Sequence, residues 1–239
     1  MRLFSWTATG RTVKRAVLLA VSSALAVIAP LQAWAEEGRS YVELTSGYKT
    51  GDFGTPVRSK LYHLSSAFGY VAPRYDFSVT LPYLSLTSGS GGANAAESGI
   101  GDIILRGGLA LFPEGEQGFS LGGSLAIKLP TADETKGLGT GETDYGAFLS
   151  LQRRIETVKL SLMSGYIKTG DPAFTDYDDI YLYGVGVSRL FGRTVLFASF
   201  EGRGAMVPGA EHPREVHLGL FHVLSADYAV KADTFSGMN

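Results

Sequence analysis

The sequence predicts an all-β protein, an antiparallel up-and-down transmembrane β-barrel of about 10–12 strands. Three observations support this prediction. From residue 40 onward, extended segments follow one another, with apolar residues at every second position. Short turns alternate with long loops. Aromatic residues gather near the ends of the segments, whereas the middles hold Leu, Val, Ala and Gly.

The first 35 residues are predicted to be a secretory signal peptide, followed by a barrel over residues 36–239. Basic residues precede an apolar run over residues 16–29, and Ala33-Trp34-Ala35 resembles a peptidase site cleaved after Ala35. A retained membrane helix is the alternative, but the run is shorter than the roughly 20 apolar residues that a span needs. We therefore expect export through the periplasm to the outer membrane.

The composition excludes several classes of function. Removing the signal peptide, which holds four basic and no acidic residues, leaves 17 basic against 23 acidic residues, a net charge of −6. A nucleic-acid partner is therefore not expected. The chain has no cysteine, which excludes disulfides, thiolate chemistry and cysteine-ligated metal.

Eleven segments show the period-two pattern in chain order. They are residues 41–49, 59–70, 74–86, 99–112, 118–129, 142–153, 157–168, 179–190, 194–205, 214–224 and 227–236. Bacterial single-chain barrels have an even number of strands, so an odd count predicts that one strand is split or missed or that the last one is absent.

The connections between these segments alternate in length. The short turns are APR, PEGEQ, IE, FGR and SAD, and the longer Gly- and acid-rich loops are TGDFGTPVR, SGSGGANAAES, TADETKGLGTGE, TGDPAFTDYDD and VPGAEHP. Short turns at one rim and long loops at the other are typical of the periplasmic and external sides of outer-membrane barrels.

The aromatic residues indicate what surrounds the apolar face. On the apolar parity, Tyr48, Tyr62, Tyr83, Tyr145, Tyr166 and Tyr181 lie beside the long loops, and Tyr70, Tyr75, Phe119, Phe191 and Tyr228 lie beside the short turns. Two aromatic belts are typical of the two lipid interfaces. The alternative is a periplasmic barrel or sandwich whose apolar face points inward, which the same alternation permits.

The opposite parity collects charges of both signs and is predicted to line a lumen. These residues are Glu43, His63, Asp76, Asp102, Arg106, Lys128, Asp144, Lys159, Glu201, Arg203, Glu215, His217, Lys231 and Asp233. They either neutralise one another across strands or form a selectivity constriction. For a constriction, the candidates are Glu201, Arg203, His217 and a cluster on three successive segments that places Arg106 opposite Lys128, Asp102 and Asp144.

Apolar residues also occur on the predicted lumen face, namely Ile104, Phe148, Met163, Val195, Phe197 and Phe221. They either fill a narrow barrel or form an apolar patch for a solute, with Phe148, Met163, Phe197 and Phe221 as its candidate residues.

Little in the sequence indicates catalysis, a cofactor or a metal. His217 shares its parity with Glu215, but no Gly-x-Ser-x-Gly motif accompanies it, so an enzyme is not expected. The loop GLGTGETD lacks the Gly-Lys-Ser/Thr of a phosphate loop. The loop DPAFTDYDD could gather calcium through its carboxylates, but it lacks regular ligand spacing, which favours a solvated acidic loop.

The run SGIGDIILRGGLALF and the later GGSLAIKLPTADETKGLGTGETDYGAFLSL resemble the outer-membrane transporter family named for the meta pathway of phenol degradation. The matching positions are Gly101, Asp102, Ile103, Lys128, Leu129, Pro130, Thr131, Gly139, Thr140, Gly141 and Asp144, with Ala132 where the family usually has glycine. The resemblance implies a barrel that takes up small, often aromatic, organic compounds.

We therefore expect a passive outer-membrane channel or transporter without a cofactor. Its expected partners are outer-membrane lipid, a small-molecule solute and the barrel-assembly machinery. The alternative is a closed outer-membrane barrel with a structural or ligand-binding surface role, and the width of the lumen discriminates between the two.

Overall fold

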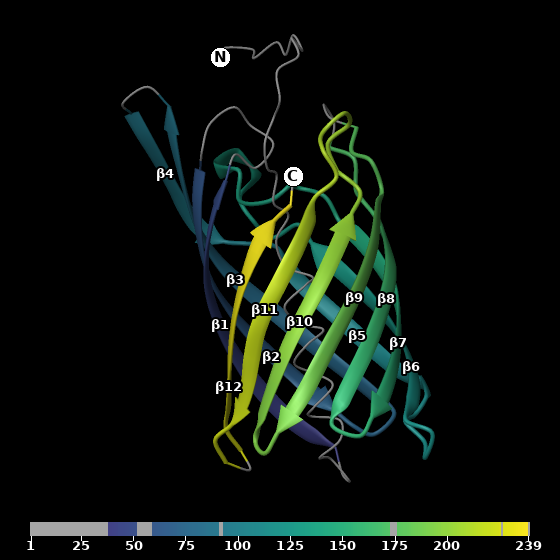
Figure 1. Ribbon diagram of the computed structural model, residues 1–239. Helices are drawn as coiled ribbons and strands as arrows, with labels where there is room; N and C mark the ends of the chain where they lie inside the picture. Colours follow the sequence, from purple (N-terminus) through teal and green to yellow (C-terminus); the bar gives the residue numbers. More distant parts are fainter. Residues whose placement is uncertain (1–37, 52–58, 91–92, 173–175, 226, 239) are drawn as a thin grey trace.

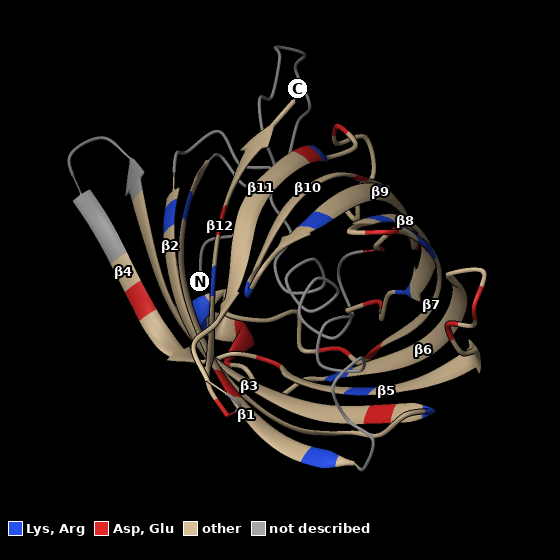
Figure 2. Ribbon diagram, turned by 60° about the horizontal axis from the view of Figure 1, so that its bottom comes forward, with Lys and Arg blue, Asp and Glu red and all other residues tan. Residues whose placement is uncertain are grey.

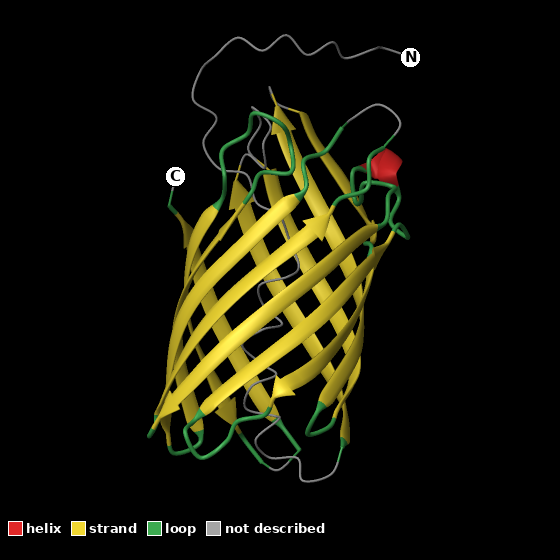
Figure 3. Cartoon of the chain, turned by 90° about the vertical axis from the view of Figure 1, so that its right-hand side faces the viewer, coloured by secondary structure: helices red, strands yellow, loops and turns green. Residues whose placement is uncertain are grey.

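The computed structural model describes residues 38–51, 59–90, 93–172, 176–225 and 227–238 as a curved antiparallel sheet that forms a barrel (Figures 1 and 3). Its strands are β1 (Arg39–Gly51), β2 (Ser59–Val71), β3 (Tyr75–Ser90), β4 (Ala93–Ile100), β5 (Ile103–Phe112), β6 (Phe119–Leu129), β7 (Asp144–Ile155), β8 (Val158–Lys168), β9 (Ile180–Phe191), β10 (Thr194–Arg203), β11 (Arg214–Val223) and β12 (Ala229–Gly237). One short 3-10 helix, η1 (Glu134–Lys136), lies between β6 and β7.

The strands follow one another around the wall in sequence order, each antiparallel to the next, except that β4 pairs only with β3. This order confirms the predicted up-and-down barrel. One end of the barrel carries the short turns, and the other carries the longer connections; we call them the short-turn end and the long-loop end. No helix in the described part of the chain is long and apolar enough to cross a membrane.

Strands β4 and β5 share one position in the wall. Tyr83–Ser90 of β3 pairs with β4, and Tyr75–Thr80 of the same strand pairs with β5. Gly101 and Asp102 interrupt the pairing, and the Gly101 N–H donates to the carbonyl of Pro82 across 2.8 Å. Within the described ranges, the sheet therefore has 12 strands in 11 wall positions, a number that matches the 11 predicted segments.

One predicted loop is wrong in extent. The segment SGSGGANAAES was expected to be a loop, but most of its residues extend β3 and form β4, and this hairpin projects beyond the wall (Figure 1). Ser, Gly and Ala have weak local strand propensity. Backbone pairing between the two strands satisfies their N–H and C=O groups, so strand structure forms where propensity did not indicate it.

The apolar parity points outward from the barrel. Leu44, Leu125 and Tyr181 are 72%, 66% and 68% exposed, respectively. Most members of both predicted aromatic belts are also exposed, and Tyr48 and Tyr62 contact each other with ring centroids 4.7 Å apart. An exposed apolar surface of this extent is not expected of a soluble sandwich, which would bury it. The predicted outward direction is confirmed.

The described residues contain only a small packed core. Phe148, Ile180 and Leu182 form its buried part, and Ala126, Ile167 and Met206 pack against them. None of the large side chains in the described ranges is fully buried. A globular domain of this length would bury many, so the interior of this sheet is a polar wall rather than a hydrophobic core.

Candidate functional site

The predicted lumen residues that lie in strands belong to the inward parity of the wall, and Asp102 lies at the break between β4 and β5. Residues of both charge signs are distributed along the strands (Figure 2). Half of the predicted lumen residues fall into two groups. The Lys128 cluster comprises Asp102, Lys128, Thr140 and Asp144, and the Glu215 cluster comprises Glu201, Arg203, Glu215 and His217.

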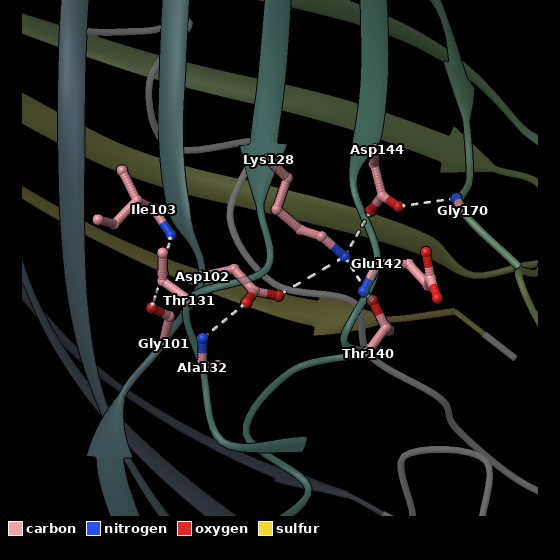
Figure 4. A network of polar contacts seen from close by, with 10 residues as sticks. All are labelled: Gly101, Asp102, Ile103, Lys128, Thr131, Ala132, Thr140, Glu142, Asp144 and Gly170. Atoms are coloured by element: carbon pink, nitrogen blue, oxygen red, sulfur yellow. Dashed lines mark hydrogen bonds and ion pairs between the residues drawn. The ribbon is translucent and has the colours of Figure 1, made fainter. Parts of the chain in front are cut away.

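Lys128 is the centre of the first cluster. Its Nζ lies 2.7 Å from Asp144 Oδ2 and 3.6 Å from Asp102 Oδ2, and it donates to Thr140 Oγ1 across 2.8 Å (Figure 4). Lys128 and Asp144 are direct cross-strand partners on β6 and β7. Antiparallel pairing therefore places the two oppositely charged side chains next to each other.

The second oxygen of each carboxylate binds a loop. Asp102 Oδ1 accepts a hydrogen bond of 3.0 Å from the Ala132 N–H, and Asp144 Oδ1 accepts one of 3.0 Å from the Gly170 N–H. Two carboxylates share one ammonium, and the backbone N–H groups compensate part of the excess negative charge. The cluster therefore joins the barrel wall to two connections at the long-loop end.

Residues around Lys128 close the break between β4 and β5. Thr131 Oγ1 accepts from the Ile103 N–H at 2.9 Å and donates to the Gly101 carbonyl at 3.0 Å. A Cβ at Gly139 would lie 2.7 Å from Ala132 Cβ and 2.8 Å from Asp102 Oδ1, so only glycine fits there. Gly141 has φ of +74°, a conformation that favours glycine.

Arg106 does not join the Lys128 cluster, although it was predicted to lie opposite Lys128. The register pairs Ile104 with Lys128 and Arg106 with Ala126, so Arg106 lies one inward position farther from the long-loop end. Its guanidinium donates to Ser124 Oγ at 3.3 Å and interacts electrostatically with Asp76. A strand register is set by pairing and turn geometry, which spacing along one chain does not specify.

The Glu215 cluster is built from side chains alone. Arg203 Nη2 lies 3.3 Å from Glu215 Oε1, and His217 Nε2 lies 3.3 Å from Glu215 Oε2. Glu201 is the direct cross-strand partner of Glu215, so two carboxylates face each other. Like charges in that position repel, and the Arg203 guanidinium, which pairs with Glu215, offsets part of the repulsion.

This cluster extends to the first and last strands. The His217 ring stacks on Phe235 of β12 with centroids 5.4 Å apart, and Lys49 Nζ of β1 lies 4.4 Å from the centre of the same ring. In the described part of the chain no backbone ladder joins β1 to β12. Side-chain contacts therefore connect the two edges of the sheet.

The register places the four apolar candidates in two pairs at neighbouring inward positions, Phe148 with Met163 on β7 and β8, and Phe197 with Phe221 on β10 and β11. Phe148 packs with Ile180 and Leu182, Phe221 is buried, and Lys231 lies 5.6 Å from the ring centre of Phe197. Met163 lines a cavity of about 20 Å³ beside the Glu215 cluster. That volume holds about one water molecule and is too small for an organic solute.

Large inward side chains face glycine across the strands. The direct cross-strand pairs are Tyr41 with Gly69, His63 with Gly47, Asp76 with Gly108, Phe148 with Gly165 and Phe197 with Gly219. A Cβ on Gly219 would lie 2.5 Å from Phe197 Cζ, and one on Gly146 would lie 2.7 Å from Phe148 Cε2. These side chains therefore lie along the wall, over glycines, rather than across the barrel.

Two contacts at the long-loop end were not predicted from the sequence. Tyr166 donates a hydrogen bond to Asp179, whose other oxygen accepts from the Thr169 N–H at 3.0 Å. The hydrogen bond from Tyr166 holds the pKa of the Asp179 carboxyl below its usual value. Thr140 was named as a position of the family motif, but its hydrogen bond with Lys128 was not predicted, because neither Tyr166 nor Thr140 has a local sequence signal for its partner.

In the acidic loop that was weighed for calcium, whose residues 173–175 lie outside the described residues, two carboxylates have hydrogen-bond partners within the chain. Asp171 accepts from the Tyr177 N–H at 3.1 Å, and Asp179 has the partners given above. Among the residues that the structure describes, no group of three or more His, Asp or Glu side chains is placed to hold a metal ion.

The curved antiparallel sheet, its apolar outer face and its charged inner face define a β-barrel of the outer-membrane type. The family model described as "Putative MetA-pathway of phenol degradation" matches residues 42–188, more than half of the chain, so the chain belongs to this family. The suspected family is thereby confirmed.

The fold also resembles a solved barrel. The translocator domain of the autotransporter NalP from Neisseria meningitidis matches with a TM-score of 0.50 and 15% identity, covering 90% of this chain and 88% of that one. At this identity the likeness concerns the fold alone. No curated protein matches the chain by sequence.

Proposed function

We propose that this protein is a passive outer-membrane channel for small organic solutes, made as a precursor whose first 35 residues direct export through the periplasm. The barrel-assembly machinery would insert it, and outer-membrane lipid would surround its apolar face. The family description, which refers to phenol degradation, supports aromatic compounds as solutes.

The five cross-strand pairs with glycine carry this proposal. Each places a bulky or charged inward side chain against a position without a Cβ, so the side chain can lie flat on the wall. A barrel that is filled by its own side chains would instead alternate large and small residues across its centre. The pairing in this wall favours a lumen that leaves a path for solute.

The test is single-channel conductance of the refolded protein in planar bilayers. A Gly165→Val substitution would displace the Phe148 ring from the wall toward the lumen, because the ring occupies the space of a Cβ at that position. We expect a conducting wild type and a lower unit conductance for Gly165→Val.

The matched control is Gly202→Val. Gly202 faces Tyr183 in the same kind of cross-strand pair, but Tyr183 is on the outer face and 49% exposed. This variant should conduct like the wild type. Stable insertion of the wild type without any current would contradict the channel and favour a closed barrel with a structural or binding role.

A further inference from the structure

One ammonium group holds parts of two connections at the long-loop end. The first loop, residues 130–143, joins β6 to β7, and a second segment, residues 169–172, follows β8. Lys128 reaches the first loop directly and the second segment through Asp144.

The first loop is attached to the wall at both of its ends. At its start, Thr131 binds the backbone on either side of Asp102, and Ala132 donates to the Asp102 carboxylate. At its end, Thr140 Oγ1 accepts from Lys128. Leu138, between these points, is only 6% exposed, and its Cδ1 lies 3.0 Å from the place of a Cβ on Gly99 of β4. The loop therefore lies against the wall.

The second segment rests on the end of the first loop. A Cβ on Gly170 would lie 2.6 Å from Glu142 Cβ and 2.8 Å from the Thr143 carbonyl oxygen, so the two backbones approach closely. The Gly170 N–H donates to Asp144, whose other oxygen is bound to Lys128. A change at Lys128 therefore affects both segments.

We propose that Lys128 is a positioning residue for the mouth of the barrel: it holds the first loop against the wall and, through Asp144, locks that loop to residues 169–172. The role of Lys128 at the mouth rests on the proposed channel function, whereas the coupling of the two segments does not depend on it. When Lys128 is absent, Asp102 and Asp144 face each other without their shared cation. The first loop is then released from the wall and enters the path of the solute.

Two measurements on the same variants test the coupling of the two segments separately from the positioning role at the mouth. The chain has no cysteine, so a single nitroxide label can be placed at Lys136→Cys in the first loop or at Asp171→Cys in the second segment. Both side chains are exposed. Electron paramagnetic resonance then reports the mobility of each segment, and single-channel recording of unlabelled protein reports closures.

In Lys128→Met we expect greater label mobility at both positions and a frequency of closures raised by at least about fivefold, in the range of ordinary coupling between sites. The ion selectivity of the open state should change little, because the closures come from the loop. Lys128→Arg, which keeps a cation that can bind both carboxylates, should restore most of the wild-type behaviour. Lys60→Met, on the exposed outer face, is the control and should change neither readout.

Unchanged mobility at either label in Lys128→Met would overturn the coupling. Greater mobility at both labels with unchanged closures would overturn the positioning role at the mouth. If the wild type carries no current but both labels become more mobile in Lys128→Met, the proposed channel fails and the coupling of the two segments is supported.

Discussion

The Lys128 cluster and the Glu215 cluster use the same kinds of side chain in different ways. In the first, each carboxylate binds one cation and one backbone N–H from a loop. In the second, Glu215 is bound by two side chains, Arg203 and His217, and a second carboxylate stands opposite. Backbone donors fix the position of a loop, whereas side-chain donors leave the wall free to rearrange its charges.

This difference separates a structural role from an electrostatic one. The Lys128 cluster lies within the part of the chain that the family model matches, and its contacts hold the connections in place. The Glu215 cluster lies beyond residue 188 and contacts the edges of the sheet at β1 and β12. We therefore expect loss of charge to have opposite effects on stability at Asp144 and at Glu201.

The largest effect should come from Asp144→Asn. This change keeps the size of the side chain but removes the charge partner that lies 2.7 Å from Lys128. Because charge-assisted hydrogen bonds contribute more than neutral ones, we expect the free energy of unfolding to fall by about 1–3 kcal/mol. Urea unfolding in lipid vesicles, followed by circular dichroism, measures it.

The control for that change is Asp171→Asn. Asp171 accepts a backbone hydrogen bond in an exposed loop, and none of the ion pairs of the described residues includes it. Its substitution should alter the free energy of unfolding by less than about 0.5 kcal/mol. Equal losses in the free energy of unfolding for the two variants would mean that the contact between Asp144 and Lys128 does not stabilise the protein.

Glu201→Gln should have a smaller effect of the opposite sign. Removing one of two like charges on directly opposed residues relieves repulsion, so we expect a gain of about 0.2–1 kcal/mol in the free energy of unfolding. Glu215→Gln is the comparison, because it removes the partner of Arg203 and His217 and should lower the same quantity. A loss in Glu201→Gln would show that Glu201 is held by an attractive contact.

The smallest effect concerns pH. The pKa of Asp179 is lowered by the hydrogen bond from Tyr166, so this carboxylate stabilises its segment above the unfolded pKa and loses that effect as the pH falls through the folded value. A nitroxide at Asp171→Cys should therefore gain mobility on acidification. In Tyr166→Phe the pKa of Asp179 rises toward its ordinary value, and the midpoint should move to higher pH.

Asp179→Asn supplies the control for this titration, because the variant has no carboxylate at that position. The mobility of the nitroxide label at Asp171→Cys should show no transition at the pH where Asp179 titrates in the wild type. A transition that is identical in wild type, Tyr166→Phe and Asp179→Asn would assign the pH response to another group.

Several parts of the structure followed from the sequence for simple physical reasons. A strand repeats every two residues, so Phe119 and Leu125 share a face whatever the neighbouring strands do. The belts of tyrosine and phenylalanine followed from their positions beside the turns. The Lys128 cluster could also be predicted in part from the sequence, because its residues lie close to the ends of consecutive strands.

Other parts depended on which residues became neighbours. The separation of Arg106 from Lys128 required the β5–β6 register, and the extension of β3 and β4 through small residues required their mutual pairing. The glycines opposite Tyr41, Phe148 and Phe197 carry no signal in a linear sequence, since glycine is common in turns and strands alike.

The sequence by itself determined which side chains share a face of the wall, because alternation along an extended chain is a local property. It also determined the family, through the motif from Gly101 to Asp144. Only the tertiary structure decided that Arg106 lies apart from Lys128, which bulky side chains lie over glycine, and how one lysine holds two connections. Those contacts depend on strand register, which is set by hydrogen bonds between segments far apart in the chain.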